Sequence, residues 1–197
     1  MNSIDILREI ANENNGIILT KTAEDKGITR SNLSKLYKNG KITRIANGQY
    51  IFSDELHDEM LSLQLHSKYI VFSHESALFL NGISERTPFE HTITIPTSKT
   101  LPRSISNQCK IYYIKDEFWE LGKTKLKTTL GNLVWSYDID RTICDIIRSR
   151  SRISDETFIS SLKLYAASQN KNLTNLSIYA EKMKILPLVR KNLEVLL

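Results

Sequence analysis

The sequence predicts an α+β fold in two parts, and three observations support this fold class. Apolar residues recur at helical spacing in the first 40 residues and again beyond residue 140. Short strand-like segments separated by turn residues fill the stretch between 69 and 137. The length of 197 residues, with 41% hydrophobic and 25% charged residues, is ordinary for a globular chain and leaves room for two domains.

The first 39 residues are predicted to form three helices. Each helix follows a Ser or Thr whose side chain can accept a hydrogen bond from the first turn. Gly27 and Gly40 end the second and third helices, because glycine readily adopts the left-handed conformation found there. The predicted helices are 4–14 after Ser3, 21–26 after Thr20 and 30–39 after Thr29.

Two β-prone segments, 42–46 and 49–52, flank the dipeptide Asn47-Gly48. Asn-Gly is the strongest short hairpin signal, because both residues tolerate a positive φ. A hairpin that directly follows a helix-turn-helix is a wing. Residues 1–53 are therefore predicted to be a winged helix-turn-helix that binds DNA.

Positive charge is concentrated in the third helix and the hairpin. The segment 26–44 carries six Lys or Arg and no acid, and the net charge of +5 favours an anionic partner. Helical periodicity puts Leu33, Leu36 and Tyr37 on an inward face. The serines and lysines then face outward, where they suit base edges and phosphates. The residues predicted to contact DNA are Arg30, Ser31, Asn32, Ser34, Lys35, Lys38, Lys41, Arg44, Asn47 and Gln49.

The rest of the chain is predicted to hold a connecting helix, a small mixed sheet and a helical C-terminal segment. A helix over 54–66 begins with acids, as its dipole favours, so 54–67 is assigned as the connector before an α+β domain at 68–197. The predicted strands are 69–73, 91–95, 110–115, 124–129 and 133–137, with a short helix at 77–80. The predicted C-terminal helices are 140–148, 155–168, 173–184 and 187–196.

Several common classes of site are not indicated. Cys109 and Cys144 belong to no CxxC pair and no Cys/His cluster, so we expect two reduced thiols and neither a zinc site nor a disulfide framework. No stretch approaches the ~20 apolar residues of a membrane span, and the N-terminus lacks the pattern of a signal peptide. We expect a cytoplasmic protein without metal or cofactor.

Three carboxylates in the second part resemble those of a metal-dependent nuclease or transferase. They are Asp138, Asp140 and Asp145. Asp138 and Asp140 also straddle a predicted helix start, where one would be the N-cap and the other would favour the helix dipole. Asp145 is spaced to form an ion pair with Arg141. The structural interpretation is therefore the stronger one.

Ser73-His74 places a nucleophile type beside a base type. Sequence neighbours seldom point at each other, and a catalytic triad is assembled in space. His74 is expected to form local hydrogen bonds instead.

Two segments resemble one known family. The stretch SHESALFLNGISERTP at 73–88 and the strand HTITIP at 91–96 resemble the antitoxins of the AbiEi family, which belong to abortive-infection, type IV toxin–antitoxin systems. The winged-helix spacing over Thr29–Tyr50 is similar, and so is the helix start RTICDII at 141–147. The resemblance covers about residues 3–150.

The resemblance implies a bacterial antitoxin that represses its own operon. Its N-terminal domain would bind operator DNA with inverted repeats, and its C-terminal domain would counter a nucleotidyltransferase-like toxin without needing a stable complex. By motif match the DNA-reading role falls on Arg30, Ser31, Asn32, Lys35, Lys38 and Arg44.

Other functions remain open at this point. A plain winged-helix regulator with a ligand- or partner-sensing C-terminal domain would share most of these features, and the metal-dependent nuclease or transferase is a third possibility. The C-terminal helices offer a second basic surface for nucleic acid or the toxin, although a solvated helical face also explains it. Its residues are Lys163, Lys171, Lys182, Lys184, Arg190 and Lys191.

Overall fold

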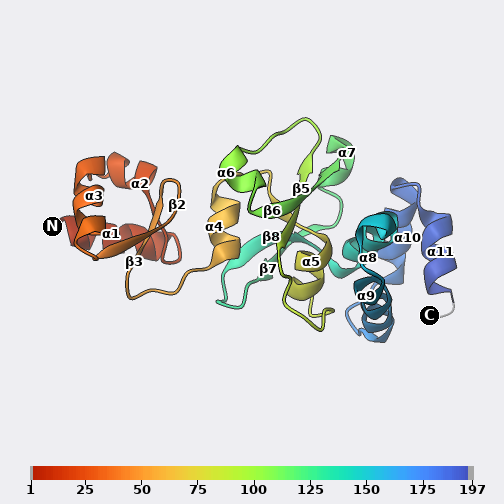
Figure 1. Cartoon of the computed structure of the whole chain (residues 1–197). Coiled ribbons are helices and arrows are strands. Elements are labelled where there is room, and N and C mark those ends of the chain that lie inside the picture. Colours follow the sequence, from red (N-terminus) through yellow and green to blue (C-terminus); the bar gives the residue numbers. More distant parts are fainter. Residues whose placement is uncertain (1, 195–197) are drawn as a thin grey trace. The chain divides into compact units, whose positions relative to one another are not determined.

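The computed structural model describes residues 2–194, which form a mixed α+β protein with eleven α-helices and two β-sheets (Figure 1). The chain divides into two compact units after Ser62. Residue 1 and residues 195–197, with the predicted end of the last helix, lie outside the described residues. No helix in the described part of the chain is long and apolar enough to cross a membrane.

The first unit contains α1 to α3, the start of α4 and a three-stranded antiparallel sheet in the order β1-β3-β2. The β2–β3 hairpin turns at Asn47-Gly48, where Gly48 has a φ of +75°, as the sequence predicts. The elements are α1 (Ser3–Glu13), β1 (Ile18–Leu19), α2 (Thr20–Asp25), α3 (Arg30–Lys38), β2 (Ile42–Ala46) and β3 (Gln49–Phe52).

One apolar cluster holds this unit together. Leu7 and Ile10 of α1 are fully buried, and Leu33 of α3 and Ile42 of β2 are 1% exposed in the same cluster. Each such side chain contributes about 1.5–3 kcal/mol by leaving water. Burial of these faces fixes which side of α3 remains in solvent.

Two of the three helix starts in this unit differ from the prediction. Thr29 caps α3, and its hydroxyl accepts a hydrogen bond from the Asn32 N–H (3.2 Å), as predicted. Asn2, rather than Ser3, caps α1, and the Asp5 carboxylate accepts a hydrogen bond from the Asn2 N–H. Thr20 is the first residue of α2, and its N–H bonds to the Gly48 carbonyl (2.9 Å). The pairing of β1 with β3 therefore decides this start instead of a side-chain cap.

The second unit contains a mixed five-stranded sheet in the order β6-β5-β4-β8-β7. β5 runs parallel to β6, and β4 runs parallel to β8, while the other pairs are antiparallel. The prediction of a small mixed sheet is confirmed. The strands are β4 (Val71–Phe72), β5 (His91–Pro96), β6 (Cys109–Ile114), β7 (Lys123–Lys127) and β8 (Leu133–Tyr137).

The predicted helix over 54–66 is shorter than expected. The chain turns after Phe52, and α4 (Glu59–Leu65) begins only after Asp58, whose carboxylate accepts the Leu61 N–H (3.1 Å). Three short helices were not predicted from the sequence. They are α6 (Arg103–Ser106), α7 (Asp116–Trp119) and the 3-10 turn η1 (Arg150–Arg152).

Helix α8 organises the C-terminal half of the second unit. It packs against α5, α9, α10 and α11; in Figure 1, α5 lies against the sheet, and α10 and α11 lie on the side of α8 away from the sheet. Ile143 and Cys144 of α8 are fully buried in the apolar cluster there, and burial raises the pKa of the Cys144 thiol. The helices are α5 (His74–Leu80), α8 (Ile139–Arg148), α9 (Asp155–Ala167), α10 (Leu173–Lys182) and α11 (Leu186–Leu193).

Candidate nucleic-acid interface

The position of α3 is set by the turn before it. Gly27 has a φ of +85°, and the N–H of Ile28 bonds to the Ala23 carbonyl of α2 (2.8 Å). The Ile28 side chain is buried beneath the turn. Thr29 then caps α3 through its hydroxyl, so a backbone hydrogen bond fixes one end of the connection between α2 and α3 and a side-chain cap fixes the other.

One face of α3 carries short polar side chains and two lysines into solvent. Ser31, Ser34, Lys35 and Lys38 are all exposed, while Leu33 is 1% exposed on the opposite face. This arrangement agrees with the helical periodicity of the sequence. The outward face therefore offers hydroxyl groups and two ammonium groups with no apolar residue between them.

Tyr37 does not lie in the core as predicted. It is 50% exposed, and its ring meets Tyr50 edge-on with centroids 6.4 Å apart. Only Leu33 and the partly buried Leu36 of this short helix pack into the apolar cluster. Tyr37 consequently borders the outward face.

Arg30 and Asn32 occupy the first turn of α3. Arg30 Nε lies 2.6 Å from Glu24 Oε1, and this hydrogen bond raises the pKa of the guanidinium. Because Glu24 already neutralises it, Arg30 offers less charge to an outside anion than Lys35 or Lys38. The Asn32 side chain is exposed.

Three of the predicted contact residues in the hairpin region are exposed. Lys41 lies at its base, and Arg44 reaches its tip, where Nη2 donates to Asn47 Oδ1 (3.0 Å). The ladder shifts register between Arg44 and Ala46, which bends the strand there. Arg44 and Asn47 thus act as one polar group at the end of the hairpin.

Gln49 must be removed from the predicted contact residues. It is 2% exposed, its amide nitrogen donates to the Ser62 carbonyl (3.0 Å), and its amide oxygen accepts the Ser62 hydroxyl (2.5 Å). Both polar ends of the side chain are satisfied inside the first unit. Gln49 therefore anchors the hairpin to α4 and presents nothing to solvent.

The predicted second basic surface is distributed over several elements. Lys163 lies on α9, Lys182 ends α10, and Arg190 and Lys191 lie on α11. The Lys171 ammonium group already has partners inside the protein, since it donates to the carbonyls of Ala166 (2.8 Å) and Ser168 (2.9 Å) at the end of α9. The exposed cations of this set are Lys163, Lys182, Lys184, Arg190 and Lys191.

The carboxylates at the start of α8 are held by hydrogen bonds. Asp138 caps the helix at the Arg141 N–H (2.8 Å) and accepts the Tyr179 hydroxyl (2.8 Å). Asp140 accepts the Tyr165 hydroxyl (2.8 Å). Burial raises the pKa of Asp138 and Asp140. These groups tie α8 to α9 and α10, and no group of three metal-binding side chains occurs among residues 2–194.

Arg141 and Asp145 form the predicted ion pair, but it is buried instead of lying on the surface. Their side chains are 0% and 2% exposed, with Nε and Oδ2 3.2 Å apart. Arg141 Nη1 also donates to the carbonyls of Phe118 (2.9 Å) and Leu121 (2.6 Å). Burial opposes the charged form of Arg141, but Asp145, Tyr137 and Cys144 together more than offset this effect, so the pKa of Arg141 is raised.

His74 forms the local hydrogen bonds that the sequence predicts, although its partner is the neighbouring Ser73, a contact that adjacent residues seldom make. His74 has a φ of +47°, and this backbone conformation brings Nδ1 to 3.0 Å from Ser73 Oγ. Nε2 lies 2.9 Å from Ser149 Oγ, and the ring stacks on Tyr112 at 3.4 Å. Burial lowers the pKa of His74 well below its usual value, with the charge of Arg148 adding to this.

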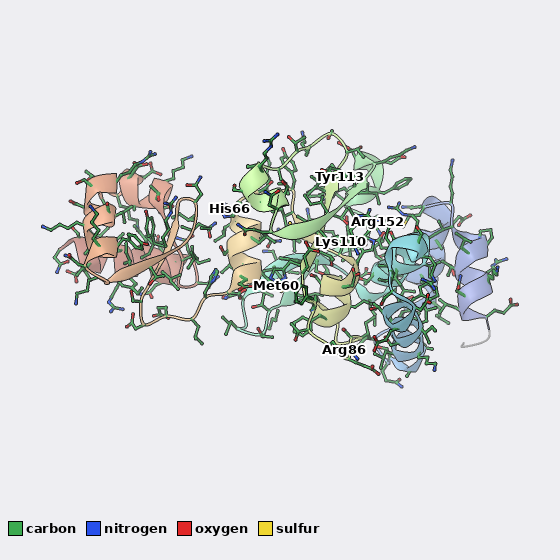
Figure 2. All side chains as sticks on the ribbon, in the orientation of Figure 1. Met60, His66, Arg86, Lys110, Tyr113 and Arg152 are labelled. Carbon is green, nitrogen blue, oxygen red and sulfur yellow. The ribbon has the colours of Figure 1, made fainter. Side chains whose placement is uncertain are left out.

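This histidine cluster has a structural character. Ser73 is fully buried and accepts the Thr94 hydroxyl (2.8 Å), so it is not available to a substrate. Nearby, Lys110 of β6 donates to the Arg152 carbonyl of η1 (3.0 Å), and Figure 2 shows the two residues close together. The cluster joins α5, the end of α8 and the sheet.

No protein-family model matches the chain, and no curated protein matches it. A solved structure with a similar fold is the crystal structure of the Rv2827c protein from Mycobacterium tuberculosis, with a TM-score of 0.71. The match has 14% sequence identity and covers 98% of this chain and 76% of that chain. At this identity the similarity concerns the fold alone.

Proposed function

We propose that the first unit is a winged helix-turn-helix that binds duplex DNA. Helices α2 and α3 form the helix-turn-helix, and the β2–β3 hairpin is the wing. The observation that carries the proposal is the outward face of α3, where the serines and lysines are exposed and Lys35 and Lys38 form no ion pair within residues 2–194. In such motifs the second helix enters the major groove while flanking groups contact the backbone.

The roles divide by chemistry. Ser31, Asn32 and Ser34 carry short polar side chains that can reach base edges, and Lys35 and Lys38 suit phosphates. Lys41 and Arg44 of the wing add two further cations. Four cations that neutralise phosphates give a slope of log affinity against log salt of about −3.5 on duplex DNA.

The resemblance to AbiEi antitoxins supports a wider proposal for the whole chain. The protein would be a cytoplasmic autorepressor that binds inverted repeats in its own operator and counters a nucleotidyltransferase-like toxin encoded beside it. The second unit would carry the antitoxin activity. The competing proposal is a plain regulator whose second unit senses a ligand or partner.

DNA binding is tested with a duplex that contains the region upstream of the gene. We expect the double substitution Lys35→Glu, Lys38→Glu to lower affinity at least 100-fold, because two phosphate contacts become repulsive. The matched control is Lys163→Glu, Lys182→Glu, which makes the same change in net charge on α9 and α10. A salt slope near zero, or equal losses in both variants, would contradict the proposal.

The antitoxin role is tested by co-expressing the full chain with the neighbouring gene. If that gene stops growth and this chain restores it, the antitoxin proposal holds. The Lys35→Glu, Lys38→Glu variant should still restore growth when expressed from an unrelated promoter, because repression and antitoxin activity reside in different units. Absence of a toxic neighbour would favour the plain regulator.

A further inference from the structure

The second unit carries a continuous surface of aromatic rings and lysines that none of the preceding roles uses. Its rings come from the segment before β4, from α7 and from β8, and all three are half-buried. We call this group the lysine–aromatic surface. Its members are Lys68, Tyr69, Lys99, Trp119, Lys123, Lys125 and Trp135.

At one end of the surface two ammonium groups approach the Tyr69 ring. Lys68 Nζ lies 5.3 Å and Lys99 Nζ 5.0 Å from its centroid. The Tyr69 ring also neighbours Trp119, with centroids 6.1 Å apart and planes at 57°. Tyr69 therefore links the lysines of two loops to the first indole.

At the other end Lys123 lies between the two indoles. Its Nζ is 3.6 Å from the Trp119 centroid and 4.8 Å from that of Trp135. Lys125 stands directly opposite Trp135 in the β7–β8 ladder, with Nζ 4.9 Å from the ring. The alternation of strand residues puts Lys123, Lys125 and Trp135 on one face of the sheet.

Two of the four lysines of this surface, Lys99 and Lys123, have a carboxylate nearby. Lys123 pairs with Glu120 (3.0 Å), and its side chain is 10% exposed, so its part is to hold the two indoles. Lys68, Lys99 and Lys125 form no ion pair with a carboxylate within the described part of the chain. The three ammonium groups rest on ring faces, and the Lys99 charge also lowers the pKa of the Asp116 carboxyl, so Lys68 and Lys125 are the two that have no carboxylate partner among the described residues.

We propose that the lysine–aromatic surface binds a single strand of nucleic acid. Unpaired bases would stack on Tyr69 and the indoles, while Lys68, Lys99 and Lys125 move from the rings to the phosphates. A lysine on an exposed ring is worth about 0.5–1 kcal/mol, and a base on an aromatic ring about 1–3 kcal/mol. The exchange is therefore favourable, and each lysine gains a phosphate partner.

The ring faces distinguish this ligand from other polyanions. In a duplex the bases are stacked on one another, so a double strand leaves the aromatic rings unused. An acidic peptide would pair with the lysines but would bring no π-face to the indoles. This site is separate from the proposed duplex-binding face of α3, because its seven residues all belong to the second unit.

Tryptophan fluorescence gives a direct test, because the two tryptophans of the chain both lie on this surface. The full-length protein is titrated with oligouridine and oligothymidine of about 12 nucleotides, a length within known single-strand site sizes. We expect both to quench the fluorescence by stacking. Unequal affinities would assign the preferred strand as RNA or DNA.

Two variants separate stacking from charge. Trp135→Leu keeps an apolar side chain and should lower affinity about 5- to 100-fold through the loss of one stacked base. Lys68→Glu, Lys125→Glu should lower affinity and flatten the salt dependence. The matched controls are Tyr113→Leu, an aromatic residue 53% exposed on β6 (Figure 2), and Lys163→Glu, Lys191→Glu on α9 and α11.

Three outcomes would overturn the proposal. They are the absence of quenching by either oligonucleotide, equal quenching by polyglutamate, and losses in the control variants as large as those in the surface variants. The Lys35→Glu, Lys38→Glu variant keeps this site distinct from α3. We expect it to lose duplex binding and to retain quenching by single strands.

Discussion

Helices α3 and α8 begin alike and use their charges in opposite ways. Thr29 caps α3 and Asp138 caps α8, each through a side-chain oxygen that accepts a backbone N–H. Lys35 and Lys38 of α3 stay in solvent, whereas Arg141 of α8 is completely buried. A cation on a helix therefore indicates an interface only when the residues around it leave it free, and a buried one holds the fold together.

The largest effect is expected from Arg141→Met. The substitution leaves the Asp145 carboxylate buried without its partner and removes two hydrogen bonds to the α7 region. Breaking a buried pair in this way costs about 3–5 kcal/mol. Both tryptophans lie in the second unit, so urea unfolding followed by their fluorescence measures the loss.

Two comparisons sharpen this result. Lys35→Met on α3 should change stability by less than about 0.5 kcal/mol, because no partner is left behind. The double substitution Arg141→Met, Asp145→Leu should recover much of the lost stability, since it removes both buried charges. A loss for the double variant equal to the single one would mean that the hydrogen bonds to the carbonyls of Phe118 and Leu121, and not the ion pair, stabilise α8.

The second expected effect concerns the turn that faces Arg141. Gly122 has a φ of +71°, and a Cβ there would lie 2.5 Å from Arg141 Cβ. Gly122→Ala combines backbone strain with overlap that no flexible side-chain end can relieve, at a cost of about 2–4 kcal/mol. Gly131→Ala is the control, because its φ is +82° but the space around it is open. Equal shifts in melting temperature would show that strain alone matters.

Gln49 provides the third test, within the proposed wing. Gln49→Met removes two hydrogen bonds and leaves the Ser62 groups without their partner, which should cost about 1–3 kcal/mol. Duplex affinity of the folded protein should be unchanged at a temperature well below unfolding. Arg44→Ala should instead lower the duplex affinity and leave the stability unchanged. Circular dichroism and a binding titration measure the two effects, and a Gln49 variant with weak binding but normal stability would restore Gln49 as a contact.

Local signals in the sequence predicted much of this fold. The Thr29 cap, the Asn47-Gly48 turn and the Asp138 helix start depend on neighbours a few residues away, so the sequence alone could reveal them. Gln49 could not be assigned in this way. Strand alternation gives two faces but does not say that Ser62, 13 residues later, covers one of them.

The same limit applies to charge. The spacing of Arg141 and Asp145 predicts an ion pair, but its burial depends on Phe118 and Leu121, which approach from another part of the chain. The lysine–aromatic surface had a partial signal in the alternating lysines of 123–127. The packing of these lysines with Tyr69 and Trp119 is a tertiary contact, and the periodicity of the sequence does not predict it.

The smallest effect is expected from the pH dependence of His74. Burial keeps the folded histidine neutral, whereas in the unfolded chain it binds a proton below its ordinary pKa of 6.5. The unfolded state then binds more protons, so stability is complete above that pH and falls by up to about 1.4 kcal/mol per unit below it. His74→Asn suits the positive φ and does not titrate. Other groups titrate alike in both proteins. The change in unfolding free energy between pH 7.5 and 5.5, compared between the original protein and the variant, therefore isolates His74. Parallel curves of unfolding free energy against pH would mean that His74 accepts the proton in the folded protein.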